Sequence, residues 1–460
     1  MAGKLSRLLL YTYGVSDLFF SLMINMELYF FAAFLTDYAQ FPLIIVGQIL
    51  GITSFIDIVC ALAGGAILQK ATLKYGGKYR SWFLVGPPII APLFILQFTK
   101  IGNDSTAAMI VMTGFILSHL LFNVVFSANG AMLGRLSSLP HERTILSASR
   151  AQGMAVAGLF FSATARPMIV FFGKHTNKIA GFSLTVGVYT LLMVLGYWYL
   201  YKITAGRDPY DEIAGDSSKS ASPQFLKQIA RLVFRNSPLL LLILSQTFLN
   251  TSYIMITTMA AYYFTYVAGR PAFLSVFILA ISLARFLGTF TARWVGVRYG
   301  KRKSYFAFTA MAAIGYASAM FVNESIWIYT LLFSISTLLA AVAGSMTTAL
   351  FADTVVYGEW KTGESIRAFT MALMNFPIKI GVLIRSAVLT TGLMVIGFVA
   401  NTDPTPRVTQ GIHSMMALIP AIGYSIATII FYFGYKLDEN QVVTMQKEIE
   451  AKKISAAGVH

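Results

Sequence analysis

A small set of ionisable residues lies inside long apolar segments of this 460-residue chain, and their chemistry needs an explanation. An ionised side chain is costly in hydrocarbon, so such a residue is paired, protonated or exposed to a water-filled cavity. By default these residues mark an ion or substrate pathway, although the acids and bases could also pair and merely hold helices together. The set comprises Asp17, Glu27, Asp57, Arg150, Arg285, Lys379 and Arg385.

The composition explains why these residues stand out. The chain is 57% hydrophobic and only 12% charged, and its mean hydropathy is +0.68. A soluble domain has about twice this charged fraction. The sequence therefore predicts a multi-pass protein of the lipid bilayer.

The apolar segments predict the fold class, an all-α integral membrane protein with twelve transmembrane helices in two six-helix halves. A spanning helix needs about 20 apolar residues, and twelve segments qualify, at roughly 11–36, 42–68, 81–98, 106–128, 145–172, 180–203, 238–267, 271–293, 304–322, 326–350, 366–400 and 413–436. The predicted domains are an N-terminal bundle (1–203), a cytoplasmic linker with a short amphipathic helix (204–237), a C-terminal bundle (238–436) and a cytoplasmic tail (437–460).

The positively charged residues are unevenly distributed among the loops. The formal net charge is +16, and the Lys and Arg residues concentrate in alternate loops, which predicts that both termini are cytoplasmic. Because no single soluble face is basic, nucleic acid is excluded as a partner.

A weak internal repeat supports two related halves. The stretch "KYGGKYRS" (74–81) follows the second apolar segment, and "RYGKRKSY" (298–305) follows the eighth. Six plus six helices with a parallel repeat is the organisation of major facilitator transporters.

The sequence offers no site for an enzyme, a cofactor or a metal. A single cysteine, Cys60, excludes an intrachain disulfide and a cysteine metal cluster, and the five histidines lack ligand spacing. Hydrolase, phosphate-loop and zinc-protease motifs are absent. His119, in the fourth segment, is interpreted as a hydrogen-bonded structural residue.

Several motifs, in order along the chain, resemble the glycoside–pentoside–hexuronide:cation symporter family of the major facilitator superfamily. They are "YGVSDLFFSLMINMELYFFAAFLTD" (13–37), "KYGGKYRSWFLVG" (74–86), "LPHERTILSASR" (139–150) and "ADTVVYGEWKTGES" (352–365). The last is similar to the family's loop into helix eleven, and it is the most specific. The resemblance implies cation-coupled import of glycosides or uronides across a bacterial inner membrane.

The resemblance implies a coupling role for Asp57, which matches the first of two carboxylates at the family's cation site. The second position holds Ala61. Sodium prefers several hard oxygen ligands, so the loss of this carboxylate favours a proton as the coupling ion, with Na⁺ as the alternative. A single buried Asp can carry a proton; it could instead be a remnant partner of Arg150 or Lys379.

On the substrate side, the resemblance places Arg150 and Lys379 at the central cavity. Two sugar-binding aspartates of the family are replaced by Ser21 and Phe126. Fewer acids and several bases predict an anionic small-molecule substrate, such as a uronide or another organic acid, since Arg binds planar anions with two hydrogen bonds. A neutral glycoside remains the alternative.

Further candidates are assigned from position. Glu27 and Arg285 are weaker substrate-binding candidates, with Phe126 as an aromatic platform. Cytoplasmic gating is predicted for Asp17, Tyr357, Gly358 and Glu359.

We therefore expect a secondary transporter that works by alternating access and requires no protein partner. One alternative on the same fold is an exporter or carrier of drug-like or amphipathic lipid molecules. A more remote alternative is a membrane sensor without transport activity. A channel is disfavoured because no pore loop is visible.

Overall fold

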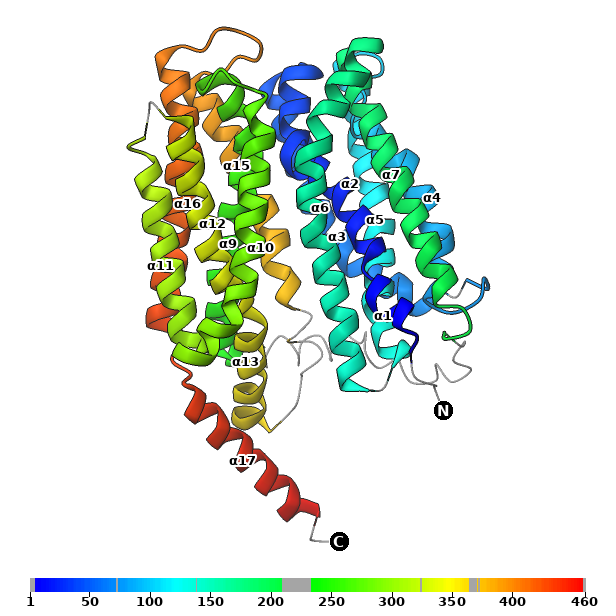
Figure 1. Cartoon of the computed structure of the whole chain (residues 1–460), viewed down its shortest axis with the longest axis vertical. Helices are drawn as coiled ribbons and strands as arrows, with labels where there is room; N and C mark the ends of the chain where they lie inside the picture. Colours follow the sequence, from blue (N-terminus) through cyan, green and yellow to red (C-terminus); the bar gives the residue numbers. More distant parts are fainter. Residues whose placement is uncertain are drawn as a thin grey trace. The chain divides into compact units, whose positions relative to one another are not determined.

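The computed structural model describes residues 5–71, 73–137, 139–208, 233–322, 325–363, 370 and 373–457. Every regular element in these ranges is helical (Figure 1). Up to residue 208 the elements are α1 (Arg7–Thr12), α2 (Val15–Met26), the π-helical turns η1 (Glu27–Phe31) and η2 (Phe34–Tyr38), α3 (Leu43–Lys70), α4 (Arg80–Leu96), α5 (Asp104–Leu136), α6 (Pro140–His175) and α7 (Lys178–Ile203).

The elements from residue 233 onward follow the same pattern. They are α9 (Ser237–Tyr262), the π-helical turn η4 (Tyr263–Val267), α10 (Phe273–Tyr299), α11 (Lys301–Ala319), α12 (Ile326–Ser345), α13 (Thr347–Thr362), the 3₁₀ turn η5 (Leu373–Asn375), α15 (Phe376–Ile396), α16 (Pro406–Gly434) and α17 (Glu439–Ala457).

The prediction of a multi-pass, all-α membrane protein is confirmed. Ten helical stretches of the described chain are long and apolar enough to cross a membrane. The shorter apolar helix α4 and the helix α11 complete the twelve predicted segments. Asparagine side chains cap the N-termini of two of these helices. Asn103 Oδ1 accepts a hydrogen bond from Thr106 N at the start of α5, and Asn177 Oδ1 accepts one from Ala180 N at the start of α7.

Three predicted segments differ in detail from the observed helices. The first is interrupted by the turn between α1 and α2 and by the π-helical turns. The tenth continues past residue 350 to Thr362, so most of the "YGEWKTG" motif is helical and its loop begins only at Gly363, whose φ is +76°. The eleventh was predicted at 366–400, whereas α15 ends at Ile396; residues 366–369 and 371–372 of the prediction lie outside the described residues.

Two further predictions concern the regions outside the bundles. The amphipathic helix predicted within the linker, with Phe225, Ile229 and Leu232 on one face, lies outside the described residues. The predicted C-terminal tail contains the helix α17. The predicted domain boundaries stay a prediction.

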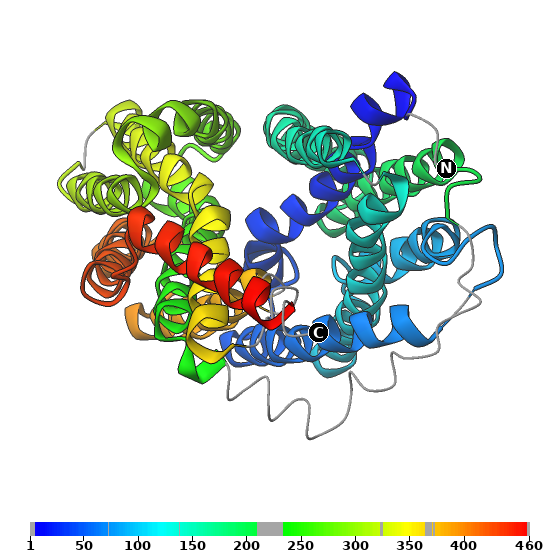
Figure 2. The same cartoon turned by 90° about the horizontal axis from the view of Figure 1, so that it is seen from below.

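The chain forms two compact units. Unit 1 comprises Met1–Glu212, Thr257–Ser282 and Ser386–Ile412, and unit 2 comprises Ile213–Ile256, Leu283–Arg385 and His413–His460. In unit 1, α2 packs against α6 and α7, while α5 packs against α3 and α4 (Figure 1). In unit 2, α11 packs against α12, and α17 runs across the end of α13 (Figure 2).

Each unit has an aromatic core. In unit 1, the ring of Phe98 meets those of Phe31, Phe34 and Phe182 at centroid distances of 5.3 to 6.4 Å. In unit 2 the core contains fully buried tyrosines such as Tyr305, whose hydroxyl group accepts a hydrogen bond from Gln246 Nε2 at 3.0 Å. A buried tyrosine is tolerated because its polar end finds a partner.

The two repeated loops are held by the same device. In "KYGGKYRS", the Asp208 carboxylate, just beyond α7, accepts from the backbone N–H groups of Tyr79 and Arg80 at 2.6 and 2.9 Å. In "RYGKRKSY", Glu439 Oε1, just beyond α16, accepts from Lys301 N at 2.8 Å. Each carboxylate thus caps the helix that follows its loop.

Glycine makes these loops possible. Gly300 has a φ of +76°, and a Cβ atom at this position would lie 3.2 Å from Glu439 Oε1. Gly77, at the equivalent place in the first loop, has a φ of +146°, and a Cβ atom there would lie 2.6 Å from Asp208 O. The repeat seen in the sequence is therefore also a repeat of loop structure.

The helices α2 and α6 cross at a point where only glycine fits. A Cβ atom on Gly153 would collide with the carbonyl group of Gly14 and lie 3.2 Å from Leu18 N. Gly14 N also donates to Ser149 Oγ at 3.0 Å across this crossing. Small residues allow membrane helices to pack closely in this way.

We expect Gly153→Ala to destabilise unit 1, because backbone atoms cannot move aside as a flexible side chain can. Overpacking of this kind costs about 1–3 kcal/mol. The measurement is the thermal unfolding midpoint of the detergent-purified protein. Gly51→Ala in α3 is the matched control, since nothing lies within 4 Å of a Cβ atom there. Equal midpoints for the two variants would contradict the close crossing.

Candidate functional site

A buried ion pair joins α2 to α6. Arg150 Nη2 donates to Asp17 Oδ1 at 2.8 Å, and Arg150 Nε lies 3.0 Å from Asp17 Oδ2. Asn129 Nδ2 donates to the same carboxylate at 3.2 Å. Asp17 is completely buried, and the Arg150 side chain is 13% exposed. Asp17, predicted to be a gating residue, and Arg150, predicted to bind substrate, therefore neutralise each other.

This pairing settles one alternative that the sequence left open. Arg150 pairs with Asp17 and not with Asp57. The Arg150 guanidinium also lies over the Phe126 ring, 5.3 Å from its centroid. Phe126 in turn stacks with Phe20 at 5.7 Å, so the predicted aromatic platform belongs to an aromatic cluster beside the ion pair.

A second polar contact joins η1 to α5. Glu27 Oε2 lies 3.2 Å from His119 Nε2, and their side chains are 11% and 5% exposed. His119 Nδ1 donates to Phe115 O at 3.0 Å, and the Phe115 ring lies parallel to the imidazole at 3.7 Å. The sequence predicted the hydrogen-bonded histidine but missed its carboxylate partner, because no local pattern links these two residues.

Asp57 belongs to the same region of unit 1. It is 6% exposed in α3, and Asn123 Nδ2 donates to its Oδ1 at 3.2 Å. The same amide group donates to His119 O at 2.7 Å. Asn123, which the sequence did not single out, thus bridges Asp57 to the helix turn that carries His119.

The remaining basic candidates lie in unit 2. The Arg285 side chain is exposed on α10, and its guanidinium lies 4.4 Å from the centroid of the Tyr253 ring. Lys379 is half-buried near the start of α15, and Arg385 is 4% exposed on the same helix.

The predicted gating motif forms the end of α13. Lys361 Nζ donates to Tyr357 Oη at 3.2 Å and to Arg235 O at 3.1 Å. Gly358 lies against Asn236, whose Nδ2 donates to Thr354 O at 2.7 Å. Glu359 is half-buried on the same turn. This end of α13 is therefore held to the start of α9.

A set of polar contacts in unit 1, which we call the η2 contacts, was not predicted. Thr36 Oγ1 donates to Asp37 Oδ1 at 2.7 Å and lies 3.0 Å from Tyr262 Oη. Asn401 Nδ2 donates to Asp37 O at 2.6 Å, and Tyr266 Oη accepts from Asn401 N at 3.0 Å. Three segments far apart in the sequence meet here.

Burial raises the pKa of Asp37 to about 6, while hydrogen bonds from Thr36 and Tyr266 lower it in part. Asp37 lies in η2, beyond the apolar span Arg7–Phe31.

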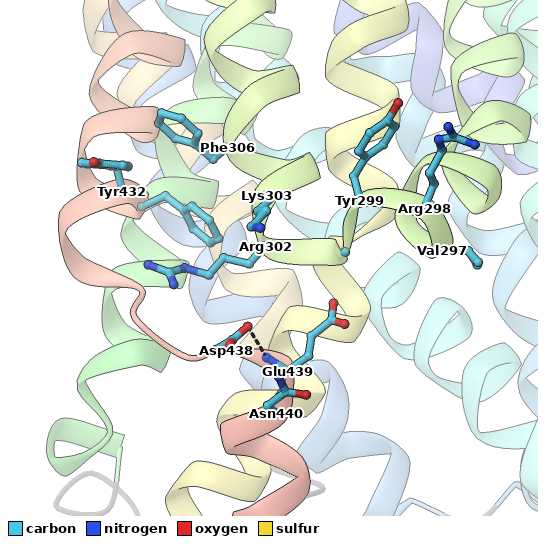
Figure 3. Close-up of a pocket in the computed structure, with 12 residues that line it drawn as sticks. Val297, Arg298, Tyr299, Arg302, Lys303, Phe306, Tyr432, Asp438, Glu439 and Asn440 are labelled. Atoms are coloured by element: carbon cyan, nitrogen blue, oxygen red, sulfur yellow. Dashed lines mark hydrogen bonds between the residues drawn. The ribbon is translucent and has the colours of Figure 1, made fainter.

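A cavity of about 530 Å³ lies in unit 2 where α10, α11, α16 and α17 meet (Figure 3). Arg302 extends beneath Tyr432, whereas Arg298 and Tyr299 point to the opposite side. None of the predicted site residues lines this cavity. Within the described ranges, no group of three or more His, Cys, Asp or Glu side chains could hold a metal ion.

Comparison with known proteins bears on what these sites do. The profile of the family described as MFS/sugar transport protein matches residues 10–439. The uncharacterized symporter YjmB of Bacillus subtilis is 25% identical over 96% of this chain and 95% of its own. An Escherichia coli relative, provisionally named as a 2,3-dihydroxypropane-1-sulfonate exporter, is 25% identical over 97% and 96%. A Salmonella typhimurium relative, provisionally named as a sulfoquinovose importer, is 24% identical over 96% and 92%.

Solved structures agree on the fold. The crystal structure of the nucleoside transporter NupG superposes with a TM-score of 0.63, covering 94% of this chain and all of that chain at 10% identity. These relatives and structural neighbours are membrane transporters and not enzymes, which confirms the prediction that this protein is not an enzyme.

We expect Asp17→Asn and Arg150→Gln each to lower the thermal unfolding midpoint strongly, because either change leaves a buried group without its partner. Breaking a buried ion pair costs about 3–5 kcal/mol. The double variant should recover part of the loss, since its two amides can still bond. The measurement is a double-mutant cycle in detergent.

The control for this cycle is the exposed pair of Lys100 and Asp104, 2.8 Å apart. Asp104→Asn should change the stability by less than about 1 kcal/mol. Additive effects of the two buried substitutions would contradict the pairing.

The raised pKa of Asp37 predicts a pH dependence of stability. Between the ordinary aspartate pKa of 3.8 and about 6, the folded protein binds more protons at this site than the unfolded chain, so stability falls as pH rises through this window. We expect Asp37→Asn to flatten the decline in the unfolding midpoint between about pH 4 and pH 7. A decline as steep as that of Asp104→Asn would refute this assignment.

Proposed function

Because the chain belongs to the MFS/sugar transport protein family, we propose that it is a proton-coupled secondary transporter of a small organic anion. Transport in this fold proceeds by alternating access, in which bundles rock around a central site. The observation that carries the coupling part of the proposal is the burial of Asp57 in an apolar helix, with an amide donor at 3.2 Å.

A proton suits Asp57 better than Na⁺ does. Sodium needs several oxygen ligands, and α3 presents Ala61 one helical turn beyond Asp57. A carboxyl group needs only to be protonated and deprotonated, and Asn123 Nδ2 stabilises its anionic form by hydrogen bonding. We therefore assign the coupling proton to Asp57.

The substrate is assigned as an anion from the relatives and from one side chain. Two relatives carry names for sulfonated compounds. Arg150 is neutralised by Asp17, so we assign anion binding to Arg285, with Lys379 as a second cation. The Tyr253 ring lies against one face of the Arg285 guanidinium. The N–H donors lie in the plane of the guanidinium, where their geometry matches a carboxylate or sulfonate.

Gating is assigned to contacts that opening must break. At one site, Lys361 Nζ donates to Arg235 O and so holds the end of α13 to the segment before α9. At the other, the η2 contacts join Thr36 and Asp37 to Tyr262 and Asn401. We place the protein in a bacterial inner membrane with both termini in the cytoplasm, following the distribution of positive charge.

The direction of transport has a specific alternative. One relative is provisionally named as an exporter, and a symporter fold can run either way when the gradient is reversed. Export of an anion in exchange for protons is therefore the second candidate, and it uses the same residues.

We expect proteoliposomes with an imposed pH gradient to accumulate sulfoquinovose, 2,3-dihydroxypropane-1-sulfonate or methyl glucuronide against its concentration gradient. Asp57→Asn should abolish accumulation while it preserves exchange of labelled for unlabelled compound. Arg285→Gln should raise the half-saturating concentration at least about tenfold, which corresponds to the loss of about 1.4 kcal/mol of binding. The measurement is uptake of the radiolabelled compounds.

Asp104→Asn serves as the control, because it also removes a carboxylate but at an exposed site. Accumulation of a neutral glycoside driven by Na⁺ alone would overturn the assignments of both the ion and the substrate. Outward accumulation under the reversed gradient would favour the export alternative.

A further inference from the structure

The contact between Glu27 and His119 requires a proton. His119 Nδ1 donates its hydrogen to Phe115 O at 3.0 Å, so a neutral His119 has a bare lone pair on Nε2. This nitrogen lies 3.2 Å from Glu27 Oε2. Two acceptors at this distance repel each other, and a proton between them removes the repulsion. Either Glu27 is protonated, or His119 is an imidazolium.

Because the pair is buried, losing this proton would leave a charge away from water. Glu27 Oε2 is buried and accepts no hydrogen bond from the described chain, and His119 Nε2 lies 3.2 Å from it. An ionised carboxylate in such a place is costly unless it is paired. With the proton present, the two side chains together are neutral, whichever atom holds it. Without the proton, the pair carries one buried negative charge.

The neighbouring groups make the pair part of a larger polar region. From α3, Asp57 is connected through Asn123 to His119 O, and Cys60 Sγ lies 3.9 Å from Ile116 O. From α4, Gln97 Nε2 donates to Ser118 Oγ at 2.9 Å, and the Phe94 ring stacks on the imidazole. Asp57 is thus the nearest further acid connected to the pair by hydrogen bonds that the structure describes.

The backbone at Glu27 supports a role beyond packing. Glu27 begins the π-helical turn η1, which interrupts the first membrane helix. Such turns are costly and occur frequently at functional sites. The irregular turn carries the acid that faces His119.

We propose that Glu27 and His119 form a second proton-binding site, which takes up and releases a proton during the transport cycle together with Asp57. The inference rests on the proposed function, because a proton must be the coupling ion. When the site opens to water, the proton leaves the Glu27–His119 pair. When it returns, the neutral pair is restored and the bundle can close.

The first test needs no substrate. Full-length protein in lipid nanodiscs, labelled with ¹⁵N-histidine, is titrated while the Nε2 signal of His119 and the infrared band of a protonated Glu27 carboxyl group are followed. We expect the shared proton to disappear with rising pH, with a shift of the Nε2 signal or loss of the carboxyl band. In Glu27→Gln the carboxyl band should be absent. If both signals stay unchanged between about pH 5 and pH 9, the pair is a static contact and the proposal fails.

The chain provides a matched control. His175 Nδ1 donates to Phe171 O at 2.7 Å, four residues earlier, as His119 does to Phe115 O. His175 is exposed and has no carboxylate partner among the described residues. Its signal should therefore be unaffected by Glu27→Gln.

The second test separates this inference from the proposed function. Uptake of labelled sulfoquinovose, 2,3-dihydroxypropane-1-sulfonate and methyl glucuronide is measured in proteoliposomes. We expect Glu27→Gln and His119→Asn to lose proton-driven accumulation but to retain exchange, whereas His175→Asn keeps both. If the wild type accumulates none of the panel under a pH gradient, the proposed function fails. If the wild type and both variants accumulate a compound equally, the proposed function stands and the second proton site is refuted.

Discussion

The structure depends on one constraint, which is that a charge inside an apolar helical bundle must meet an opposite charge or a proton in the same bundle. Unit 1 satisfies this constraint in two ways. Asp17 and Arg150 satisfy it with a bidentate ion pair that Asn129 completes. Glu27 and His119, 3.2 Å apart, satisfy it in our proposal by holding one proton between the two side chains. The first solution is permanent as long as the helices stay together, whereas the second can be undone by water.

This difference suggests a division of labour among the buried acids of unit 1. An arginine stays charged at any physiological pH, so the carboxylate that it holds cannot readily exchange a proton. Asp57 accepts a hydrogen bond from an amide, and Glu27 lies beside an imidazole instead. We therefore propose proton coupling for Asp57 and Glu27 and a structural role for Asp17, which an arginine holds.

Two loops that connect helices are stabilised in the same way, by a carboxylate cap. Asp208 and Glu439 each cap the helix that follows a glycine-containing basic loop, and each comes from the segment after the last helix of its set. A carboxylate at a helix start stabilises both the unpaired backbone N–H groups and the helix dipole. Because the contact is polar and lies at a helix end, it can hold a loop firmly without adding charge inside the membrane.

The sequence by itself determined the membrane class, the long apolar helical segments and the family, because hydropathy and residue type are properties of short stretches of chain. It placed the end of the tenth segment too early, since polar helix turns near a membrane surface look like loops. Only the tertiary structure decided the partners. From the sequence, Asp57 was a possible partner of Arg150 or Lys379, and His119 was only a hydrogen-bonded structural residue. The structure pairs Arg150 with Asp17 and places Glu27 beside His119. Which residues face each other depends on helix rotation and packing, which are set by contacts between segments distant in sequence and which leave no local pattern.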